Sequence, residues 1–230
     1  MSQKIQVIQL IDGFATTEKS GGAALFGIRL ARMLNKDLIK SIVCGLWHYN
    51  TASEQYWINQ LSVEGIHARQ LIETKSQLHF DLFRACHYLR SIINSAEPVI
   101  INTHFERGDL LALAFNAFYP TQRIAIVRTI HQNKHWLNRP WMGSVLNLVY
   151  PWMFEAEVAI SKTTQNWLDQ RPVARITRRY STQIYNSLSH AEIEKFKRTQ
   201  PRRESFAPPR FAIVGRLELQ KGHSLSLIHI

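Results

Sequence analysis

The sequence predicts an α/β fold built on a doubly wound parallel sheet. Three observations support this prediction. Short apolar runs alternate with segments of helical periodicity, as in chains whose helices cover both faces of a parallel sheet. Turn residues separate these segments. The composition, 45% hydrophobic and 20% charged residues over 230 positions, is that of a globular protein long enough for one domain and part of another.

The apolar runs predict seven strands in the first domain. The expected strands are 4–11, 41–47, 66–72, 98–101, 123–130, 158–160 and 183–185.

Helical spacing of apolar residues predicts a helix after most of these strands. Gly21 opens the first helix, and Ser161 is a suitable N-cap for the helix that starts at Lys162. The other expected helices are 54–63, 78–93, 110–118, a segment within 142–154, and 162–168.

A second domain is expected to begin near the end of the chain. Residues 197–209 contain three prolines and clustered arginines, which indicates an interdomain linker after a domain of residues 1–196. A short apolar run, 211–214, then leads into Gly215-Arg216 and Lys221-Gly222. Two cations at the carboxyl end of a strand are well placed to bind a diphosphate. Residues 210–224 are therefore expected to be the first strand and phosphate loop of an incomplete second Rossmann-like domain.

The final residues, 225–230, do not continue this pattern well. They match one reading frame of a sequencing adaptor, and we interpret them as an adaptor-derived tail on a truncated chain; a genuine helix start is the alternative.

Candidate site residues follow the first, fourth and fifth expected strands. Gly21 and Gly22 would let the backbone approach a ligand and present free N–H groups at a helix N-terminus. His104 and His131 each follow a strand, where open sheets bind ligands. His131 and His135 are four residues apart, but no Glu or Cys completes a metal site with them.

These motifs resemble those of the GT-B glycosyltransferases, specifically glycosyltransferase family 4. The matching features are the Gly-Gly-Ala turn at Gly21, a histidine at positions 104 and 131, Asn186, and the cations Arg216 and Lys221. Ser187 and Ser189 depart from the family pattern, which has Gly and Asp there. The resemblance covers the first half of such an enzyme, the acceptor-side domain.

The resemblance implies transfer of a sugar from a nucleotide-sugar to a glycan or lipid-linked acceptor, with retention of configuration and without a metal or other cofactor. It implies that His131 acts at the donor sugar, and that Gly21, Gly22, Arg216 and Lys221 bind the donor phosphates. His104, Glu106 and Asn186 would line the acceptor side of the cleft. The chain alone would be inactive. Two alternatives remain: a nucleotide-sugar 2-epimerase of the same fold, and a non-catalytic module that binds membrane or nucleic acid.

Charge and composition bear on location and partners. The net charge is +11, and the basic excess lies in residues 171–230. This excess fits a solvated linker, an anionic membrane surface or nucleic acid, and we regard nucleic acid as the weakest of these three interpretations.

The segment 136–152 is rich in Trp and aliphatic residues, which could pack on the sheet or meet lipid headgroups. The N-terminus is not a secretory signal, and Cys44 and Cys86 are expected to be buried thiols. We therefore expect a cytoplasmic protein, peripheral at the inner membrane face if it meets lipid.

Overall fold

The computed structural model describes residues 4–17, 20–73, 78–94, 96–120, 124–132, 136, 140–187 and 190–199. The chain divides into two compact units, Met1–Ser187 and Leu188–Ile230. The described element of the second unit is helix α8, His190–Thr199, which includes the first three residues of the segment expected as a linker. The segments 210–224 and 225–230 lie outside the described residues.

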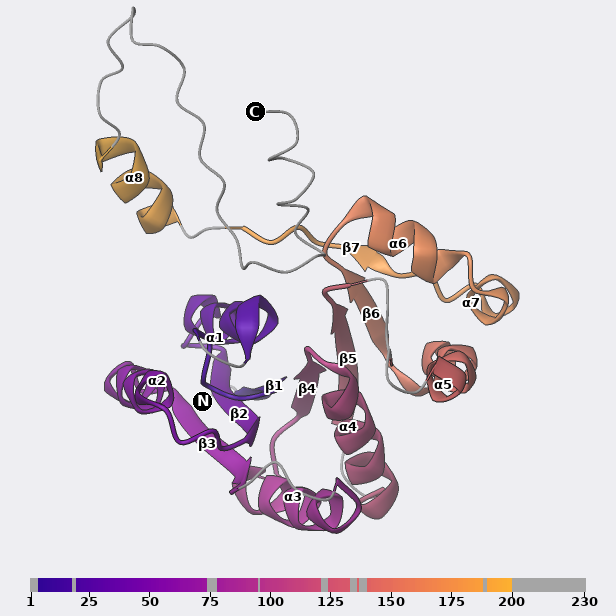
Figure 1. Ribbon diagram of the computed structural model, residues 1–230, viewed down its shortest axis with the longest axis horizontal. Coiled ribbons are helices and arrows are strands. Elements are labelled where there is room, and N and C mark those ends of the chain that lie inside the picture. Colours follow the sequence, from indigo (N-terminus) through magenta and orange to yellow (C-terminus); the bar gives the residue numbers. More distant parts are fainter. Residues whose placement is uncertain are drawn as a thin grey trace, which may run out of the picture. The chain divides into compact units, whose positions relative to one another are not determined.

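The first unit is a Rossmann-like α/β domain, which confirms the predicted fold class. Its seven strands are all parallel and follow the order β3-β2-β1-β4-β5-β6-β7 (Figure 1). The strands are β1 (Ile5–Ile11), β2 (Ile39–Trp47), β3 (His67–Ile72), β4 (Val99–Thr103), β5 (Ile124–Ile130), β6 (Ala156–Ala159) and β7 (Thr182–Gln183).

The strand order reverses between β1 and β4. The chain first adds strands outward from β1 to β3 and then returns to the other side of β1. Two loops that leave the sheet in opposite directions open a crevice at such a point, and open α/β sheets bind ligands there. Since Leu10 pairs with Thr103, Asp12 and His104 follow at the same carboxyl edge.

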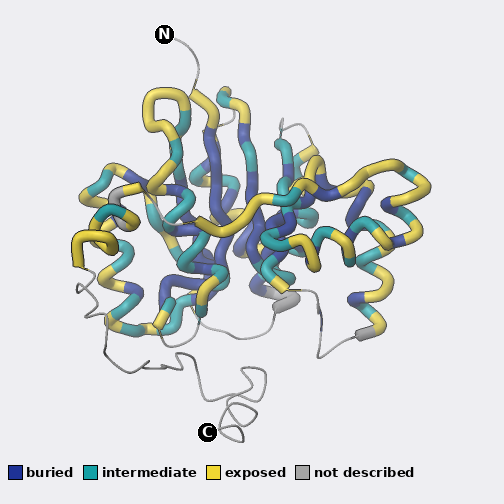
Figure 2. The backbone as a smooth tube through the Cα atoms, turned by 90° about the horizontal axis from the view of Figure 1, so that it is seen from above, coloured by how far each residue is buried: buried dark blue, intermediate teal, exposed yellow. Residues whose placement is uncertain are grey.

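Helices cover both faces of the sheet. On one face, α1 (Gly21–Met33) and α2 (Ala52–Val63) bury Val43 of β2 in a cluster that includes Phe14 and Leu61. On the other, α3 (Leu78–Ile92) and α4 (Glu106–Phe118) bury the next residue, Cys44, in a larger cluster. This alternation is the period-2 pattern of a strand with both faces covered, and Figure 2 shows the strands as the buried centre of the domain.

Two helix starts differ from the prediction for identifiable reasons. Helix α2 begins at Ala52 rather than Glu54, because Thr51 and Glu54 form a capping box. Helix α4 begins at Glu106 rather than Leu110, with two acidic residues in its first turn. Such charges suit the positive end of a helix. Ser161 caps α6 (Lys162–Asp169) through the backbone N–H of Thr164, as predicted.

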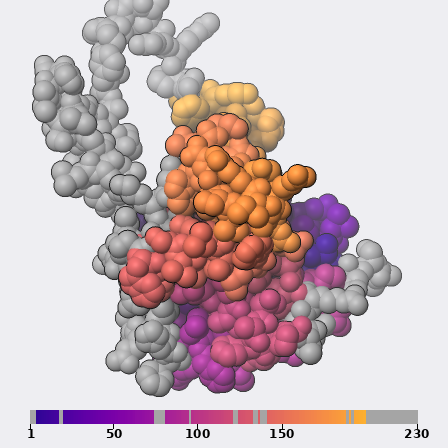
Figure 3. Space-filling model, turned by 90° about the vertical axis from the view of Figure 1, so that its right-hand side faces the viewer, coloured from indigo at the N-terminus to yellow at the C-terminus, as the bar shows by residue number. Residues whose placement is uncertain are grey.

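The segment rich in Trp and aliphatic residues forms α5 (Pro140–Met153), beside which the unpredicted short helix α7 (Pro172–Thr177) packs. One side of α5 packs on the domain and buries Tyr150. The opposite side leaves four large side chains exposed at helical spacing, Trp141, Val145, Leu148 and Trp152. Figure 3 views the face of the molecule that α5, α6 and α7 form. None of the described helices is long and apolar enough to cross a membrane.

Candidate functional site

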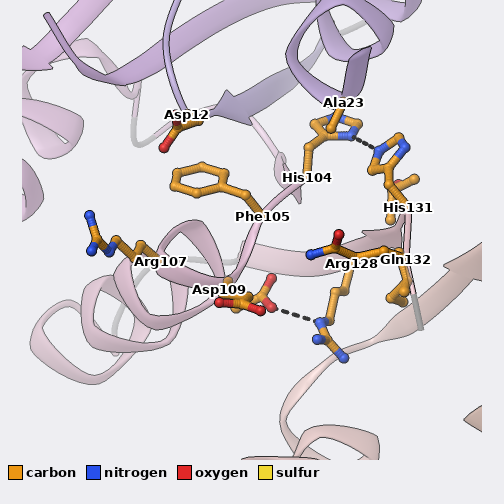
Figure 4. A pocket seen from close by; sticks show the side chains of 12 residues that line it. Asp12, Ala23, His104, Phe105, Arg107, Asp109, Arg128, His131 and Gln132 are labelled. Atoms are coloured by element: carbon orange, nitrogen blue, oxygen red, sulfur yellow. Dashed lines mark hydrogen bonds and ion pairs between the residues drawn. The ribbon is translucent and has the colours of Figure 1, made fainter. Parts of the chain in front are cut away.

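Two histidines meet at the carboxyl edge of the sheet. His104 directly follows β4 and His131 directly follows β5, so the parallel register brings them together. His104 Nδ1 lies 3.1 Å from His131 Nε2, a hydrogen bond (Figure 4). Phe26 of α1 contacts both rings edge-on, with centroids 5.7 and 5.3 Å away. The histidine pair is therefore held between the sheet edge and α1.

Helix α1 approaches the pair closely because residue 27 is glycine. A Cβ built on Gly27 would lie 2.6 Å from Cγ2 of Ile11 and 3.0 Å from Cδ2 of His104. Real Cβ atoms essentially never come within 3.0 Å of another heavy atom, so a larger residue at position 27 would force a shift of α1 or of Ile11.

A buried polar network supports His104 from behind. Gln9 of β1 places its Oε1 2.8 Å from His104 Nε2, and the same oxygen accepts a hydrogen bond of 3.0 Å from Asn102 Nδ2. Thr129 Oγ1 in turn donates to Asn102 Oδ1 over 2.9 Å. All four side chains are at least nine-tenths buried; three lie on the adjacent strands β1, β4 and β5, and His104 directly follows β4. The network therefore ties the position of His104 to the sheet itself.

Both histidines are uncharged at neutral pH. Burial holds the pKa of His104 well below its ordinary value, and the neighbouring His131 lowers it further. Burial also lowers the pKa of His131, to about 4. A neutral imidazole carries one N–H and one lone pair, so the pair acts through hydrogen bonds rather than through positive charge.

A cavity of about 340 Å³ opens beside the pair. In Figure 4, Asp12, Phe105 and Arg107 lie on one side of it and the histidines on the other, with Asp109 and Arg128 below. Its lining comes from the loops after β1 and β4, from the last three residues of β5 and the residues that follow it, from α1 and from the first turn of α4. The lining residues are Asp12, Ala23, His104, Phe105, Glu106, Arg107, Asp109, Arg128, Thr129, Ile130, His131 and Gln132.

Two of the carboxylates in this lining are engaged at the cavity wall. Asp12 Oδ2 accepts a hydrogen bond of 2.7 Å from the hydroxyl of Tyr49. Glu106 accepts a hydrogen bond from the backbone N–H of Trp136, and so ties Trp136 to the first turn of α4. Arg107 lies over the ring of Trp47, 5.4 Å from its centroid. The cavity thus presents both acidic and basic groups, which suits a polar ligand.

A buried ionic cluster forms the floor of the cavity. Arg128 donates from Nε to Asp109 over 2.7 Å and from Nη1 to Glu157 over 3.1 Å. Glu157 also pairs with Arg171, and Asp109 accepts from the hydroxyl of Thr103 over 2.6 Å. The two cations and two anions balance. This cluster fixes the ends of β4, β5 and β6 relative to α4 and so shapes the cavity.

The N-terminus of α1 adjoins the cavity through Ala23. Gly21 adopts a φ of +66°, which favours glycine, and a Cβ built on Gly21 or Gly22 would meet no atom within 4 Å. Ser20 precedes the helix without making a side-chain cap, and its buried Oγ has no hydrogen-bond partner. The first amide groups of α1 therefore receive no hydrogen bond from the Ser20 side chain, and such uncapped amides at a helix N-terminus are suited to binding an anion.

The structure brings together some of the predicted site residues. His104, His131 and Glu106 line the cavity, with Gly21 and Gly22 at the adjacent end of α1. Asn186 is exposed and does not belong to this lining. Arg216, Lys221, Ser189 and His135 lie outside the described residues. Among the residues that the structure describes, no three His, Cys, Asp or Glu side chains gather closely enough to hold a metal ion. The roles of these residues stay predictions.

Sequence reasoning did not select several residues that line or support the site. Asp12 follows β1 and Arg107 follows β4 at the carboxyl edge, so strand position alone could have indicated both. Gln9 and Arg128 are polar residues inside apolar strands, which signals a buried partner. The identity of those partners depends on strand order, which no local pattern contains.

Comparisons with known proteins support the fold alone. The sequence matches no protein-family model and no curated protein. Among solved structures, the N-terminal domain of trehalose-6-phosphate phosphatase from Candida albicans is similar over 84% of this chain and 50% of its own, with a TM-score of 0.50 and 12% identity. A protein from Listeria monocytogenes described as a UDP-N-acetylglucosamine 2-epimerase is similar over 86% of this chain and 52% of its own, with a TM-score of 0.48 and 14% identity. The chain thus spans about half the length of both solved chains.

Proposed function

We propose that this chain is the acceptor-side half of a glycosyltransferase that moves a sugar from a nucleotide-sugar to a glycan or lipid-linked acceptor. The observation that carries the proposal is the neutral pair His104–His131, set in a polar cavity at the point where the strand order reverses. The N-terminus of α1, which Ser20 does not cap through its side chain, adjoins that cavity through Ala23 and supports a phosphate site there. The reaction proposed, sugar transfer, is taken from the resemblance of the motifs to glycosyltransferase family 4.

In this proposal the residues divide by what they bind. The amides of Gly21 and Gly22 approach the donor phosphate, and Arg216 and Lys221 of the donor-side half offset the charge of the leaving diphosphate. This charge compensation takes the place of a metal. His131 lies at the donor sugar, where its neutral ring can accept a hydrogen bond from a sugar hydroxyl. The acceptor enters beside Glu106 and His104.

The acceptor side is proposed to lie at an anionic membrane surface. The exposed stripe of α5 (Trp141, Val145, Leu148 and Trp152) is apolar and aromatic, and Arg175 and Arg178, in or next to α7 beside it, are exposed. Aromatic side chains flanked by cations favour the headgroup region of a bilayer. Sedimentation with vesicles of phosphatidylcholine alone, or with added phosphatidylglycerol, tests this part. Equal recovery of the chain and of a Trp141→Ser, Trp152→Ser variant in both pellets would argue against it.

A nucleotide-sugar 2-epimerase remains the second candidate, because the cavity contains acidic groups that proton transfer requires. Asp12 is the carboxylate best placed for this, since it faces the cavity and keeps one oxygen beyond its bond to Tyr49. The two reactions differ chemically. Epimerisation at carbon 2 exchanges a carbon-bound proton with solvent and needs no acceptor, whereas glycosyl transfer leaves that proton in place.

The test uses the complete protein encoded by the gene from which this chain comes. A panel of labelled nucleotide-sugars is incubated with candidate acceptors in D₂O, and both transferred label and deuterium in the sugar are measured. Transfer without deuterium supports the proposal, and deuterium uptake without acceptor supports the epimerase. If neither occurs with a folded protein, the chain is better explained as a binding module. Arg216→Ala and Lys221→Ala are expected to weaken donor binding by about 1.5–3 kcal/mol each.

A further inference from the structure

We propose that Gln9 is a positioning residue that acts through His104 to fix which ring nitrogen of His131 carries the proton. Gln9 lies on β1, and a chain of two hydrogen bonds connects its side chain to the ring of His131. The tautomer itself follows from contacts within this chain. Its consequence for sugar transfer rests on the proposed function.

The first step is the contact between Gln9 and His104. The atom of Gln9 that lies 2.8 Å from His104 Nε2 is the carbonyl oxygen Oε1. A carbonyl oxygen can only accept, so His104 Nε2 must carry the proton. Asn102 supports this orientation of Gln9, because its amide nitrogen donates to the same oxygen while its own oxygen accepts from Thr129. The Asn102 nitrogen also lies 3.4 Å from His104 Nε2, but this contact is longer than the 2.8 Å contact with Gln9 Oε1, so the Gln9 oxygen decides the tautomer of His104.

The second step extends this proton assignment from His104 to the ring of His131. His104 is neutral, because burial holds its pKa well below the ordinary value. A neutral ring with its proton on Nε2 has a lone pair on Nδ1. His131 Nε2, 3.1 Å away, must then donate to it. His131 is consequently held with its proton on Nε2 and with Nδ1 as its hydrogen-bond acceptor.

The third step connects the tautomer to the site. His131 lines the cavity, whereas Gln9 lies behind His104 and does not belong to the lining. A ligand hydroxyl can donate to His131 only at the nitrogen that lacks a proton. Gln9 therefore decides which nitrogen of His131 serves a ligand, although it touches none itself. Removing the hydrogen-bond partner that orients a metal-bound histidine typically lowers activity roughly 10- to 100-fold, and we expect an effect of similar size for a partner that orients a histidine without a metal.

The reverse orientation of the amides gives a distinct, observable state. If Gln9 presented its amide nitrogen to His104, donor and acceptor would exchange roles in both hydrogen bonds that connect Gln9, His104 and His131. His131 would then carry its proton on Nδ1. The two states differ in the ¹⁵N chemical shifts of the ring nitrogens and in their couplings to the ring protons.

The experiment is ¹⁵N-labelled histidine NMR on the 230-residue chain at pH 7. We expect a protonated Nε2 and an unprotonated Nδ1 on both His104 and His131. Gln9→Glu keeps an acceptor oxygen and should preserve these signals. Gln9→Leu removes it and should give a mixture of tautomers on both rings. Gln6→Leu is the matched control, because Gln6 is a buried glutamine of the same strand that instead hydrogen-bonds the backbone of Asn94.

Two results would overturn the inference: a protonated Nδ1 on His131 in the unaltered chain, or unchanged tautomers in a folded Gln9→Leu variant. If that variant does not fold, the unaltered chain still decides the first point. In the complete protein, Gln9→Leu should lower kcat roughly 10- to 100-fold with little change in the KM for the nucleotide-sugar. Absence of any transfer by the complete protein, with the tautomers as expected, would refute the proposed function and leave the role of Gln9 intact.

Discussion

Replacing Arg128 by methionine tests whether the ionic cluster beneath the cavity holds the fold together. Arg128 is 1% exposed, pairs with Asp109 and Glu157, and stacks on the ring of Tyr150 with its central carbon 4.1 Å from the centroid. Methionine keeps much of the apolar contact with Tyr150 and removes the charge. Glu157 would keep Arg171 as a partner, but Asp109 would keep only the hydroxyl of Thr103. The variant therefore leaves one buried carboxylate without a cation.

Breaking a buried pair by removing one partner typically costs about 3–5 kcal/mol, because the remaining charge stays desolvated. We expect this loss in the free energy of unfolding. Since a domain of this size loses roughly 2–4 °C in Tm per kcal/mol, Tm should fall by about 6–20 °C. Urea unfolding followed by circular dichroism measures the first quantity and a thermal scan the second.

The control is Arg175→Met, which removes an exposed arginine of α7 and should change stability by less than about 0.5 kcal/mol. A double variant, Arg128→Met with Asp109→Asn, removes both members of the pair and should be more stable than Arg128→Met alone by about 2 kcal/mol. The reasoning fails if Arg128→Met is no more destabilising than Arg175→Met, or if adding Asp109→Asn makes the protein still less stable.

Three further predictions concern packing, thiol reactivity and pH. Gly27→Ala should destabilise the domain by about 1–3 kcal/mol, because the added Cβ would collide with Ile11. Gly22→Ala is the control and should be close to neutral, because its Cβ would meet open space. Equal effects of the two substitutions in urea titrations would contradict the close approach of α1. Burial raises the pKa of Cys44 and of Cys86 to about 12. Both thiols should therefore react with a disulfide reagent at pH 8 at least about 100-fold more slowly in the native chain than in denaturant. Rapid labelling of the native chain would refute their burial. The depressed pKa of His131, about 4 against roughly 6.5 in the unfolded chain, means that below pH 6.5 the unfolded state binds a proton that the folded state does not. The titration of His131 should therefore leave the stability unchanged well above pH 6.5 and lower it as the pH drops from 6.5 towards 4. A His131→Gln variant should show a smaller fall in stability over that range.

The alternation of strands and helices was predictable because local patterns carry it. The apolar runs at β1, β2 and β5 begin and end within two residues of the expected bounds. Errors arose where a side chain outside the apolar pattern sets a boundary, as at the capping box of Thr51 and Glu54. Helix α7 was missed because it is only 6 residues long, too short to show a helical period, although Pro172 at its start is a typical helix-opening residue.

The sequence by itself determined the class of fold, because the two-residue and 3.6-residue periods of apolar side chains follow directly from backbone geometry. It also placed His104 and His131 each at the end of a strand. Only the tertiary structure decided that these two rings form a hydrogen bond, that Gln9 lies behind them, and that Arg128 pairs with Asp109 and Glu157. Those contacts join residues that are 19 to 95 positions apart in the chain. They depend on the order and register of the strands, which arise from packing of the whole sheet and which no segment encodes alone.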